Sequence, residues 1–170
     1  MQLLKEISQK SLGINDEEIL GTPFELRKSA RGIIINNEGL MALQHLTNRN
    51  YHKLPGGGVD PGETEEEALA REIIEEVGYS INTPTQLGVT IEYRNFEELL
   101  HISYGYSTTV IEKIAEPSLE ANELDEGQET IWVTPQEAIA LMRKDTPVET
   151  QGKFILAREI CFLEKFLEKT

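Results

Sequence analysis

The sequence predicts an α/β protein in which a mixed sheet is covered by helices on both faces. Three observations support this fold class. Predicted strands and amphipathic helical patterns are interleaved irregularly, and hairpin-type turns occur between strands. Pairs of predicted strands also lie before and after a predicted helix. A doubly wound parallel sheet would show strands and helices in regular alternation, which this chain does not.

The first elements are a hairpin and a glycine-rich loop. The β-branched stretch 27–35 and the stretch 40–46 flank residues 36–39, Asn-Asn-Glu-Gly, which are typical of a hairpin turn. A short strand at 51–54 precedes residues 55–58, Pro-Gly-Gly-Gly. Glycines give this loop unusual conformational freedom, so it can approach other groups closely.

The clearest helix is predicted over 64–78. Thr64 and Glu67 have the spacing of a capping box, and Gly78 supplies a stop. The remaining predicted elements are strands at 85–94, 99–111 and 130–133, a helix that opens with Thr134-Pro135, and a last amphipathic helix at about 151–167.

Length and composition limit the class of protein. A chain of 170 residues can bury the core of one domain, and its single cysteine, Cys161, excludes an internal disulfide. The longest aliphatic run, 33–35, is far shorter than the roughly 20 residues of a membrane span, and the start shows no secretory signal pattern. We expect a cytoplasmic protein without membrane contact. Residues 1–25, with a turn at residues 15–18, should form an N-terminal extension that packs on a domain of residues 26–170.

The formal net charge of −14 is concentrated in two segments. Residues 57–79 contain eight acids and one base, and residues 112–129 contain seven acids and one base. Such a chain should repel a nucleic-acid backbone, so a nucleic-acid polymer is not an expected partner. Clustered carboxylates can instead hold hard divalent cations, although a solvated acidic surface is an equally good interpretation of the second segment.

One face of the helix 64–78 is a strong candidate for such a cation site. Placed on a helix, Glu72, Glu75 and Glu76 lie close together, opposite an apolar face that should pack on the sheet. Like charges at these spacings repel, and only Arg71 is near enough to relieve the repulsion. Carboxylate oxygens are the ligands that Mg²⁺ and Mn²⁺ prefer.

The same residues resemble a known family signature. The pattern in this chain is Gly57-x5-Glu63-x7-Arg71-Glu72-Ile73-x-Glu75-Glu76-x-Gly78-Tyr79. It is similar to the signature of the Nudix (MutT-type) hydrolases at all seven fixed positions, with an aromatic Tyr79 where an aliphatic residue is usual. The resemblance implies an α/β/α sandwich with a mixed, strongly bent sheet. It also implies Mg²⁺- or Mn²⁺-dependent hydrolysis of a nucleoside diphosphate linked to another group.

The resemblance implies roles for individual residues. The metal ligands would be Glu72, Glu75, Glu76 and the backbone carbonyl of Gly57. Glu63, Arg71, Glu72 and Glu75 are assigned to catalysis, with the Glu63–Arg71 pair orienting the loop against the helix. The general base is either Glu72 or a distal acid, for which the candidates are Glu116, Glu120, Glu123 and Glu126.

Arg27, Arg31, Tyr51 and Glu120 are the candidates for substrate binding. A guanidinium suits bidentate contact with a phosphate, whereas the alternative for the two arginines is an edge-strand role in solubility. For Tyr51 the alternative is half-buried packing. The expected substrate is a small nucleotide, and nucleoside triphosphates are favoured because the signals of the ADP-ribose and dinucleoside-polyphosphate subfamilies do not fit.

Two other functions on this fold deserve comparison. A catalytically silent nucleotide-binding sensor would typically lack some of the signature glutamates, and all are present here. An isoprenoid diphosphate isomerase would need a cysteine near the front of the fold, where Cys161 does not lie. Relatives are often dimers, so a homodimer is left open.

Overall fold

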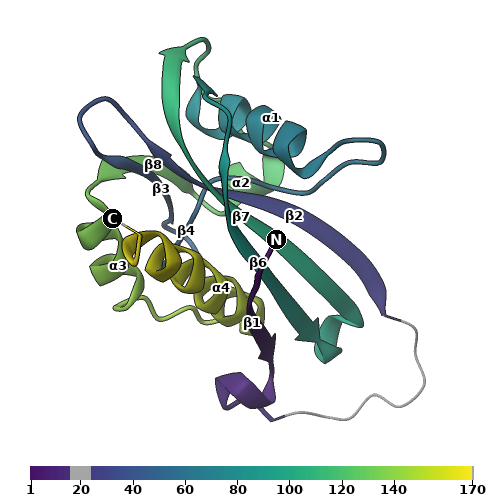
Figure 1. Cartoon of the computed structure of the whole chain (residues 1–170). Helices are drawn as coiled ribbons and strands as arrows, with labels where there is room; N and C mark the ends of the chain where they lie inside the picture. The colour runs from purple at the N-terminus through teal and green to yellow at the C-terminus, as the bar shows by residue number, and fades with distance from the viewer. Residues whose placement is uncertain (16–23, 170) are drawn as a thin grey trace.

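The chain folds around one mixed sheet of eight strands, shown in the computed structural model of Figure 1. The structure describes residues 1–15 and 24–169, so most of the turn expected at residues 15–18 lies outside the described residues. The strands are β1 (Leu3–Ser8), β2 (Glu25–Ile35), β3 (Met41–Leu46), β4 (Tyr51–Lys53), β5 (Tyr79–Ile81), β6 (Thr85–Arg94), β7 (Leu99–Lys113) and β8 (Gln128–Val133). Their main order is β1-β6-β7-β2-β3-β4, with β5 on β7 and β8 on β3.

The sheet combines parallel and antiparallel pairs. β2 pairs with β7 in parallel, and β1 pairs with β6 in parallel; the other pairs are antiparallel. The sheet is open, and its long strands curve strongly (Figure 1). The N-terminal segment therefore contributes β1 to the sheet, a strand that the local sequence pattern does not predict.

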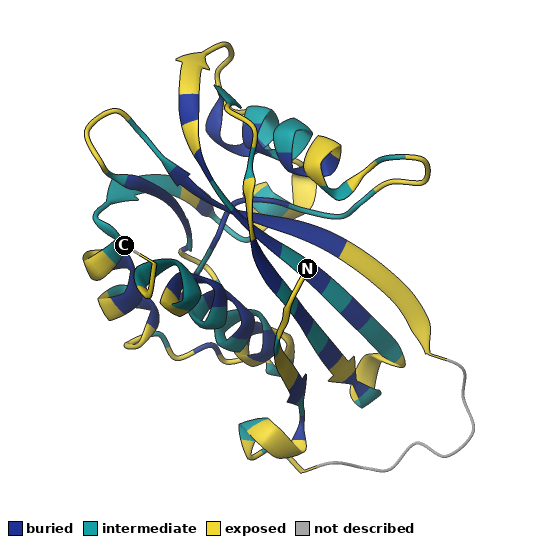
Figure 2. Ribbon diagram, viewed as in Figure 1, coloured by how far each residue is buried: buried dark blue, intermediate teal, exposed yellow. Residues whose placement is uncertain are grey.

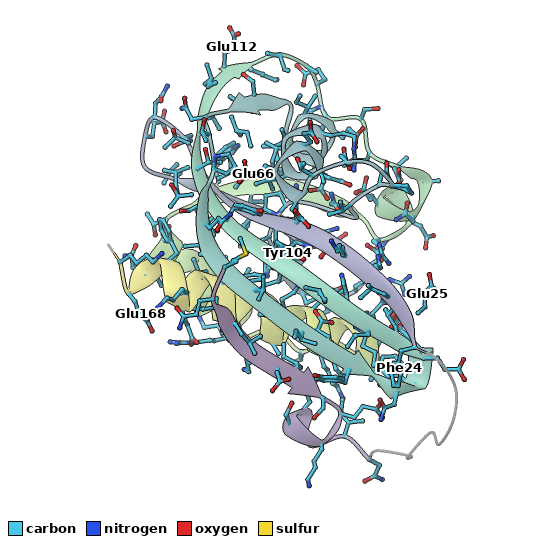
Figure 3. The ribbon with its side chains drawn as sticks, turned by 45° about the vertical axis from the view of Figure 1, so that its right-hand side comes forward. Phe24, Glu25, Glu66, Tyr104, Glu112 and Glu168 are labelled. Atoms are coloured by element: carbon cyan, nitrogen blue, oxygen red, sulfur yellow. The ribbon has the colours of Figure 1, made fainter. Side chains whose placement is uncertain are left out.

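Helices cover both faces of the sheet, as the sequence predicts. The helices are α1 (Glu65–Val77), α2 (Ala121–Asp125), α3 (Pro135–Met142) and α4 (Thr150–Leu167), with 3-10 turns η1 (Lys10–Leu12) and η2 (Asn95–Glu97). α1 lies on one face, and α3 and α4 lie on the other (Figure 1). In Figure 3, Glu66 of α1 and Tyr104 of β7 are on the near side of the sheet, with α4 behind it. None of the described helices is long and apolar enough to cross a membrane.

Two apolar cores hold these layers together, and Figure 2 shows them as the buried interior on each side of the sheet. Under α1, Leu69 and Ile73 pack against Ile34 of β2. Under α3 and α4, Phe162 packs with Ile33 of β2 and Met142. Successive residues of β2 therefore serve opposite cores, which is the two-residue period of a strand buried on both faces.

α1 begins and ends where the sequence predicts. The Thr64 hydroxyl accepts a hydrogen bond from the Glu67 backbone N–H at 3.2 Å, and the Glu67 carboxylate accepts one from the Thr64 N–H at 2.8 Å. Gly78 has a φ of 84° and donates its N–H to the last turn of the helix. This geometry fixes the start of α1 next to the glycine-rich loop.

The interpretation of Arg31 as an edge-strand residue is wrong, because β2 has neighbours on both sides at this position. β7 pairs with β2 along its whole length. On the other side, the loop of residues 55–59 makes backbone hydrogen bonds to β2 between Lys28 and Gly32. β2 therefore has a neighbour on each side from Lys28 to Gly32, whereas Arg27 precedes this part, and β2 carries the loop on which the site is built.

Candidate metal and diphosphate site

The glycine-rich loop is fixed to β2 by three backbone hydrogen bonds. The N–H of Ala30 donates to the Gly57 carbonyl at 3.0 Å, and the N–H of Gly32 donates to the Pro55 carbonyl at 3.0 Å. The N–H of Val59 donates back to the Lys28 carbonyl at 3.1 Å. The loop thus behaves as a short extension of the sheet and has a defined position beside α1.

Two glycines in this loop lie in close approach to their neighbours. Gly56 has a φ of +125°, which disfavours other residues, and a side chain there would overlap the carbonyl of Ala30. A methyl group on Gly57 would overlap the carboxylate of Glu72. The backbone can therefore lie directly against the acidic face of α1. The Gly57 carbonyl, which the resemblance implies as a metal ligand, is the acceptor of the Ala30 N–H.

Arg71 ties the loop to the helix. Its guanidinium donates to both oxygens of Glu63, from Nε at 2.9 Å and from Nη2 at 3.1 Å, and Nη2 also donates to the Gly58 carbonyl at 3.0 Å. Nη1 contacts Glu72 at 2.9 Å and Glu75 at 3.2 Å. The Arg71 guanidinium holds the pKa of Glu63 below its usual range. The structure therefore contains the Glu63–Arg71 contact that the resemblance implies.

Three carboxylates meet at the junction of α1 and α2. Ligand atoms of Glu72, Glu76 and Glu123 all lie within 4.8 Å of one another, and within residues 1–15 and 24–169 this is the one group of three ligand-type side chains with that spacing. We call these residues the carboxylate group. Glu75 does not belong to it; its side chain is 44% exposed and contacts Arg71.

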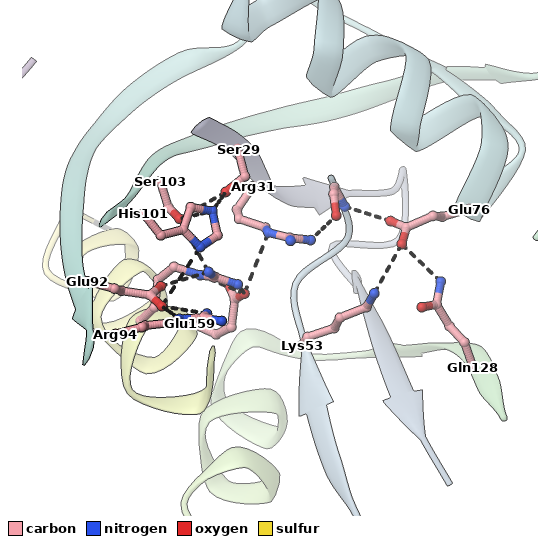
Figure 4. A network of polar contacts seen from close by, with 12 residues as sticks. Ser29, Arg31, Lys53, Glu76, Glu92, Arg94, His101, Ser103, Gln128 and Glu159 are labelled. Carbon is pink, nitrogen blue, oxygen red and sulfur yellow. Dashed lines mark hydrogen bonds and ion pairs between the residues drawn. The ribbon is translucent and has the colours of Figure 1, made fainter. Parts of the chain in front are cut away.

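Glu76 is the most deeply buried member of the carboxylate group, at 1% exposed. One of its oxygens accepts the Gly56 N–H at 2.6 Å. The other accepts the side-chain amide of Gln128 at 2.9 Å and lies 3.5 Å from the Lys53 ammonium (Figure 4). Glu76 is therefore held in one orientation by the loop, β8 and β4.

The carboxylate group has more negative charge than its surroundings neutralise. Burial raises the pKa of Glu72, with Arg71 opposing the shift and Glu76 adding to it. Burial also raises the pKa of Glu123 to about 7, and Glu76 adds to this shift. Anionic oxygens that are close together and partly desolvated are the donor set that hard divalent cations prefer, so the residues present fit Mg²⁺ or Mn²⁺.

The short helix α2 decides which acid of the second acidic segment reaches the site. Glu120 precedes α2, and its backbone N–H donates to the Glu123 carboxylate at 2.7 Å. Of the four distal acids proposed from the sequence, only Glu123 joins the carboxylate group. The Glu-x-x-Glu spacing of Glu120 and Glu123 is a capping-box pattern with an unusual first residue, which is why the sequence alone did not single it out.

The candidate substrate residues differ in exposure. Arg27 and Glu120 are exposed, and Glu120 is outside the carboxylate group. Arg31 is 8% exposed and donates to the Gly56 carbonyl. Tyr51 is buried beside Gly152, and burial raises its pKa to about 12.

Comparisons with known proteins agree with this geometry. The chain is 37% identical over 76 residues to a Bacillus subtilis protein provisionally named an 8-oxo-dGTP diphosphatase, covering 45% of this chain and 50% of that protein. It is 44% identical over 57 residues to an RNA pyrophosphohydrolase of Erythrobacter litoralis, covering 32% of this chain and 35% of that protein. The matches thus span half or less of these relatives' lengths.

Solved structures share the fold at low sequence identity. A MutT protein from Methanosarcina mazei aligns with a TM-score of 0.59 at 20% identity, over 88% of this chain and 98% of the other. An ADP compounds hydrolase aligns with a TM-score of 0.63 at 18% identity, over 86% and 74% of the two chains. The family model described as the NUDIX domain matches residues 26–155, so the chain belongs to the Nudix family.

Proposed function

We propose that this chain hydrolyses a diphosphate linkage in a nucleoside diphosphate joined to another group, with Mg²⁺ or Mn²⁺ as cofactor. The observation that carries this proposal is the carboxylate group beside a loop whose Gly56 admits no side chain. Membership of the Nudix family and the diphosphate chemistry in the names of the two relatives support the reaction class.

The residues divide into ligands and supports. Glu72 and Glu76 would hold the metal, with Glu123 facing them from α2 and Glu75 next to them on α1. When bound, the metal would neutralise phosphate oxygens and lower the pKa of the attacking water. Arg71 keeps the loop against α1 through Glu63, so the ligands keep their spacing.

The reaction is an attack of water at phosphorus. The water oxygen forms a bond to phosphorus, the bridging P–O bond breaks, and the bridging oxygen leaves with the second phosphate. A carboxylate takes the water's proton. We assign this step to Glu123, because it is the one distal acid that α2 places beside Glu72 and Glu76.

The substrate class is a small nucleotide, with nucleoside triphosphates as the first group to test. The names of the two relatives point to an oxidised nucleoside triphosphate and to RNA that carries a pyrophosphate end. A panel for the first assay therefore contains ordinary and oxidised nucleoside triphosphates, nucleotide sugars, ADP-ribose, dinucleoside polyphosphates and a 5′-triphosphorylated oligoribonucleotide.

The decisive variant is Glu76→Gln, measured as phosphate or pyrophosphate release with Mg²⁺, with Mn²⁺ and with EDTA. We expect turnover that EDTA abolishes and that Glu76→Gln lowers by at least about 100-fold, because a glutamine keeps a hydrogen-bond acceptor for Gly56 but loses the charge that binds the metal.

Glu66→Gln is the matched control, since Glu66 is an exposed acid on the same helix. It should keep the wild-type rate. A Glu76→Gln protein with a near-normal rate would contradict the metal assignment. Nucleotide binding without turnover on any member of the panel would replace the hydrolase with the sensor interpretation.

A further inference from the structure

A second group of buried charges lies between the sheet and α4. Its members come from β2, β6, β7 and α4, and each is less than 9% exposed. We call it the arginine network: Arg31, Glu92, Arg94, His101, Arg158 and Glu159 (Figure 4). The reaction proposed above does not use it, and its residues are far apart in the sequence.

The network is connected by short contacts that start on α4. Arg158 donates to Glu159 from Nη2 at 2.6 Å and to Glu92 from Nη1 at 2.8 Å. Glu92 accepts a further hydrogen bond from Arg94 at 2.6 Å. Each buried carboxylate thus has an arginine partner, as buried charges require.

Arg31 extends from this network to the glycine-rich loop. Its Nε lies 3.8 Å from Glu159 Oε1, and its Nη1 donates to the carbonyl of Gly56. The guanidinium therefore bridges a buried carboxylate of α4 and the backbone of the loop (Figure 4). A planar fork with several donors can make such a bridge, whereas a lysine presents its charge at one point.

Gly56 is consequently held from both sides. Its carbonyl accepts from Arg31, and its N–H donates to Glu76. The carbonyl belongs to the peptide unit that follows the Gly56 Cα and the N–H to the unit that precedes it, so the two contacts hold the backbone on both sides of this Cα. Since Glu76 belongs to the carboxylate group, a metal-site carboxylate is bonded to a residue whose carbonyl Arg31 holds.

We propose that Arg31 is a positioning residue for Glu76: with its charge facing Glu159 of α4, it fixes the Gly56 backbone whose N–H orients the Glu76 carboxylate. This inference rests on the proposed function for its catalytic meaning. It replaces the phosphate-gripping role that the sequence suggested for Arg31, because the Nη1 of this buried side chain already serves the loop.

The environment of Arg31 agrees with this role. Burial and the neighbouring Arg158 lower the pKa of Arg31, and Glu159 counteracts them. The Nε of Arg31 and the Oε2 of Glu159 are buried without a hydrogen-bond partner in the structure. Arg31 therefore faces Glu159 as a charge at longer range, and its direct hydrogen bond is the one to the Gly56 carbonyl.

The first test uses metal-free protein labelled with ¹⁵N-glycine. Hydrogen exchange of the Gly56 amide is measured by NMR in the wild type, in Arg31→Met and in Arg94→Met. The two variants are matched, because each removes one buried arginine and leaves its carboxylate with Arg158. We expect Arg31→Met to speed Gly56 exchange at least about 10-fold, and Arg94→Met to change it less than about 2-fold.

The second test measures Mn²⁺ binding by electron paramagnetic resonance on the same proteins, together with kcat and KM. Arg31→Met should weaken Mn²⁺ binding by about 10-fold and lower kcat more than it raises KM, as loss of a supporting contact does. Arg94→Met should bind Mn²⁺ normally. Equal effects of the two variants, or unchanged Gly56 exchange in Arg31→Met, would overturn the inference.

Two further arms keep the outcomes distinct. If Arg31→Met does not fold, Arg31→Lys replaces it; this variant keeps the charge but cannot bridge Gly56 and Glu159, so faster Gly56 exchange is still expected. If wild-type protein neither binds Mn²⁺ nor turns over any substrate, the proposed function fails, while Gly56 exchange still reports on the role of Arg31.

Discussion

The carboxylate group and the arginine network both contact Gly56, one at its N–H and the other at its carbonyl, and both bury charged side chains, but their charges are arranged differently. In the arginine network, Arg158 contacts two carboxylates and Arg94 adds a contact to Glu97. In the carboxylate group, three acids have Lys53 at 3.5 Å and Arg71 at 2.9 Å as their cations, and Arg71 is shared with three more acids.

This difference separates a structural cluster from a site. Buried ions that neutralise each other need no outside partner, and removing one of them leaves an uncompensated charge. Carboxylates in excess instead create repulsion that a bound cation would relieve. The comparison therefore predicts opposite changes in the free energy of unfolding of the metal-free protein. Neutralising an acid of the arginine network should lower it, and neutralising an acid of the carboxylate group should raise it.

The largest expected effect is in the arginine network. Glu159→Gln removes the charge that faces Arg31 and accepts two hydrogen bonds from Arg158. Because this carboxylate is fully buried, we expect the free energy of unfolding to fall by about 3–5 kcal/mol in urea denaturation. Glu164→Gln, on the same helix with a half-exposed side chain, should cost less than about 1 kcal/mol. Similar losses in both variants would remove the distinction between buried and surface pairs.

The second prediction concerns His101 of β7, which is buried in the same network. Burial lowers its pKa, and the arginines that face it add to the shift: Arg158 of α4, Arg94 of β6, and Arg31 and Arg27 of β2. The Glu92 carboxylate, 3.9 Å from Nδ1, does not offset them. His101 therefore stays neutral in the folded protein.

The sign of the pH dependence follows from this neutrality. In the unfolded chain the histidine takes a proton below its ordinary pKa of 6.5, so the unfolded state binds more protons and stability falls as the pH falls. At pH 5.5 the loss is about 1.4 kcal/mol. His101→Gln, which can still bond Ser29, should lack this contribution when unfolding is measured from pH 7.5 to 5.5. Parallel pH profiles of the two proteins would contradict a buried neutral histidine.

The two regions also differ in how far the sequence predicts them. The fold class follows from the order of the elements along the chain, and α1 with its caps follows from a pattern of about 15 residues. The pairing of Glu63 with Arg71 was implied by the resemblance to the Nudix signature. Local spacing carries this information because helix caps and i, i+4 neighbours are set by the chain nearby. Glu72 and Glu76 were therefore predicted correctly as close neighbours on one helix face.

The arginine network has no such local signal. Arg158 and Glu92 are 66 residues apart, and Arg31 meets Glu159 only because α4 packs under β2 and β6. β1 is likewise defined by parallel pairing with a distant strand, β6. The choice of Glu123 over Glu120 required α2, a helix of five residues whose first turn has no strong sequence pattern. These features depend on tertiary contacts that one sequence does not specify locally.

The smallest expected effect tests the other half of the comparison. Glu123→Gln removes one charge from the carboxylate group and keeps an acceptor for the Glu120 N–H. In metal-free buffer at pH 8, above the raised pKa of about 7, wild-type Glu123 is charged and repelled by Glu76, so the variant should be more stable by about 1 kcal/mol after allowance for solvent screening. Glu120→Gln, one turn away and outside the group, should change stability by less than about 0.3 kcal/mol in the same thermal or urea unfolding series.

Saturating Mg²⁺ should reverse the order of wild type and Glu123→Gln, because the wild type gains more binding free energy from the ion. A Glu123→Gln protein that is less stable than wild type without metal would mean that these acids are compensated like those of the arginine network, and the group would lose its distinction as a cation site.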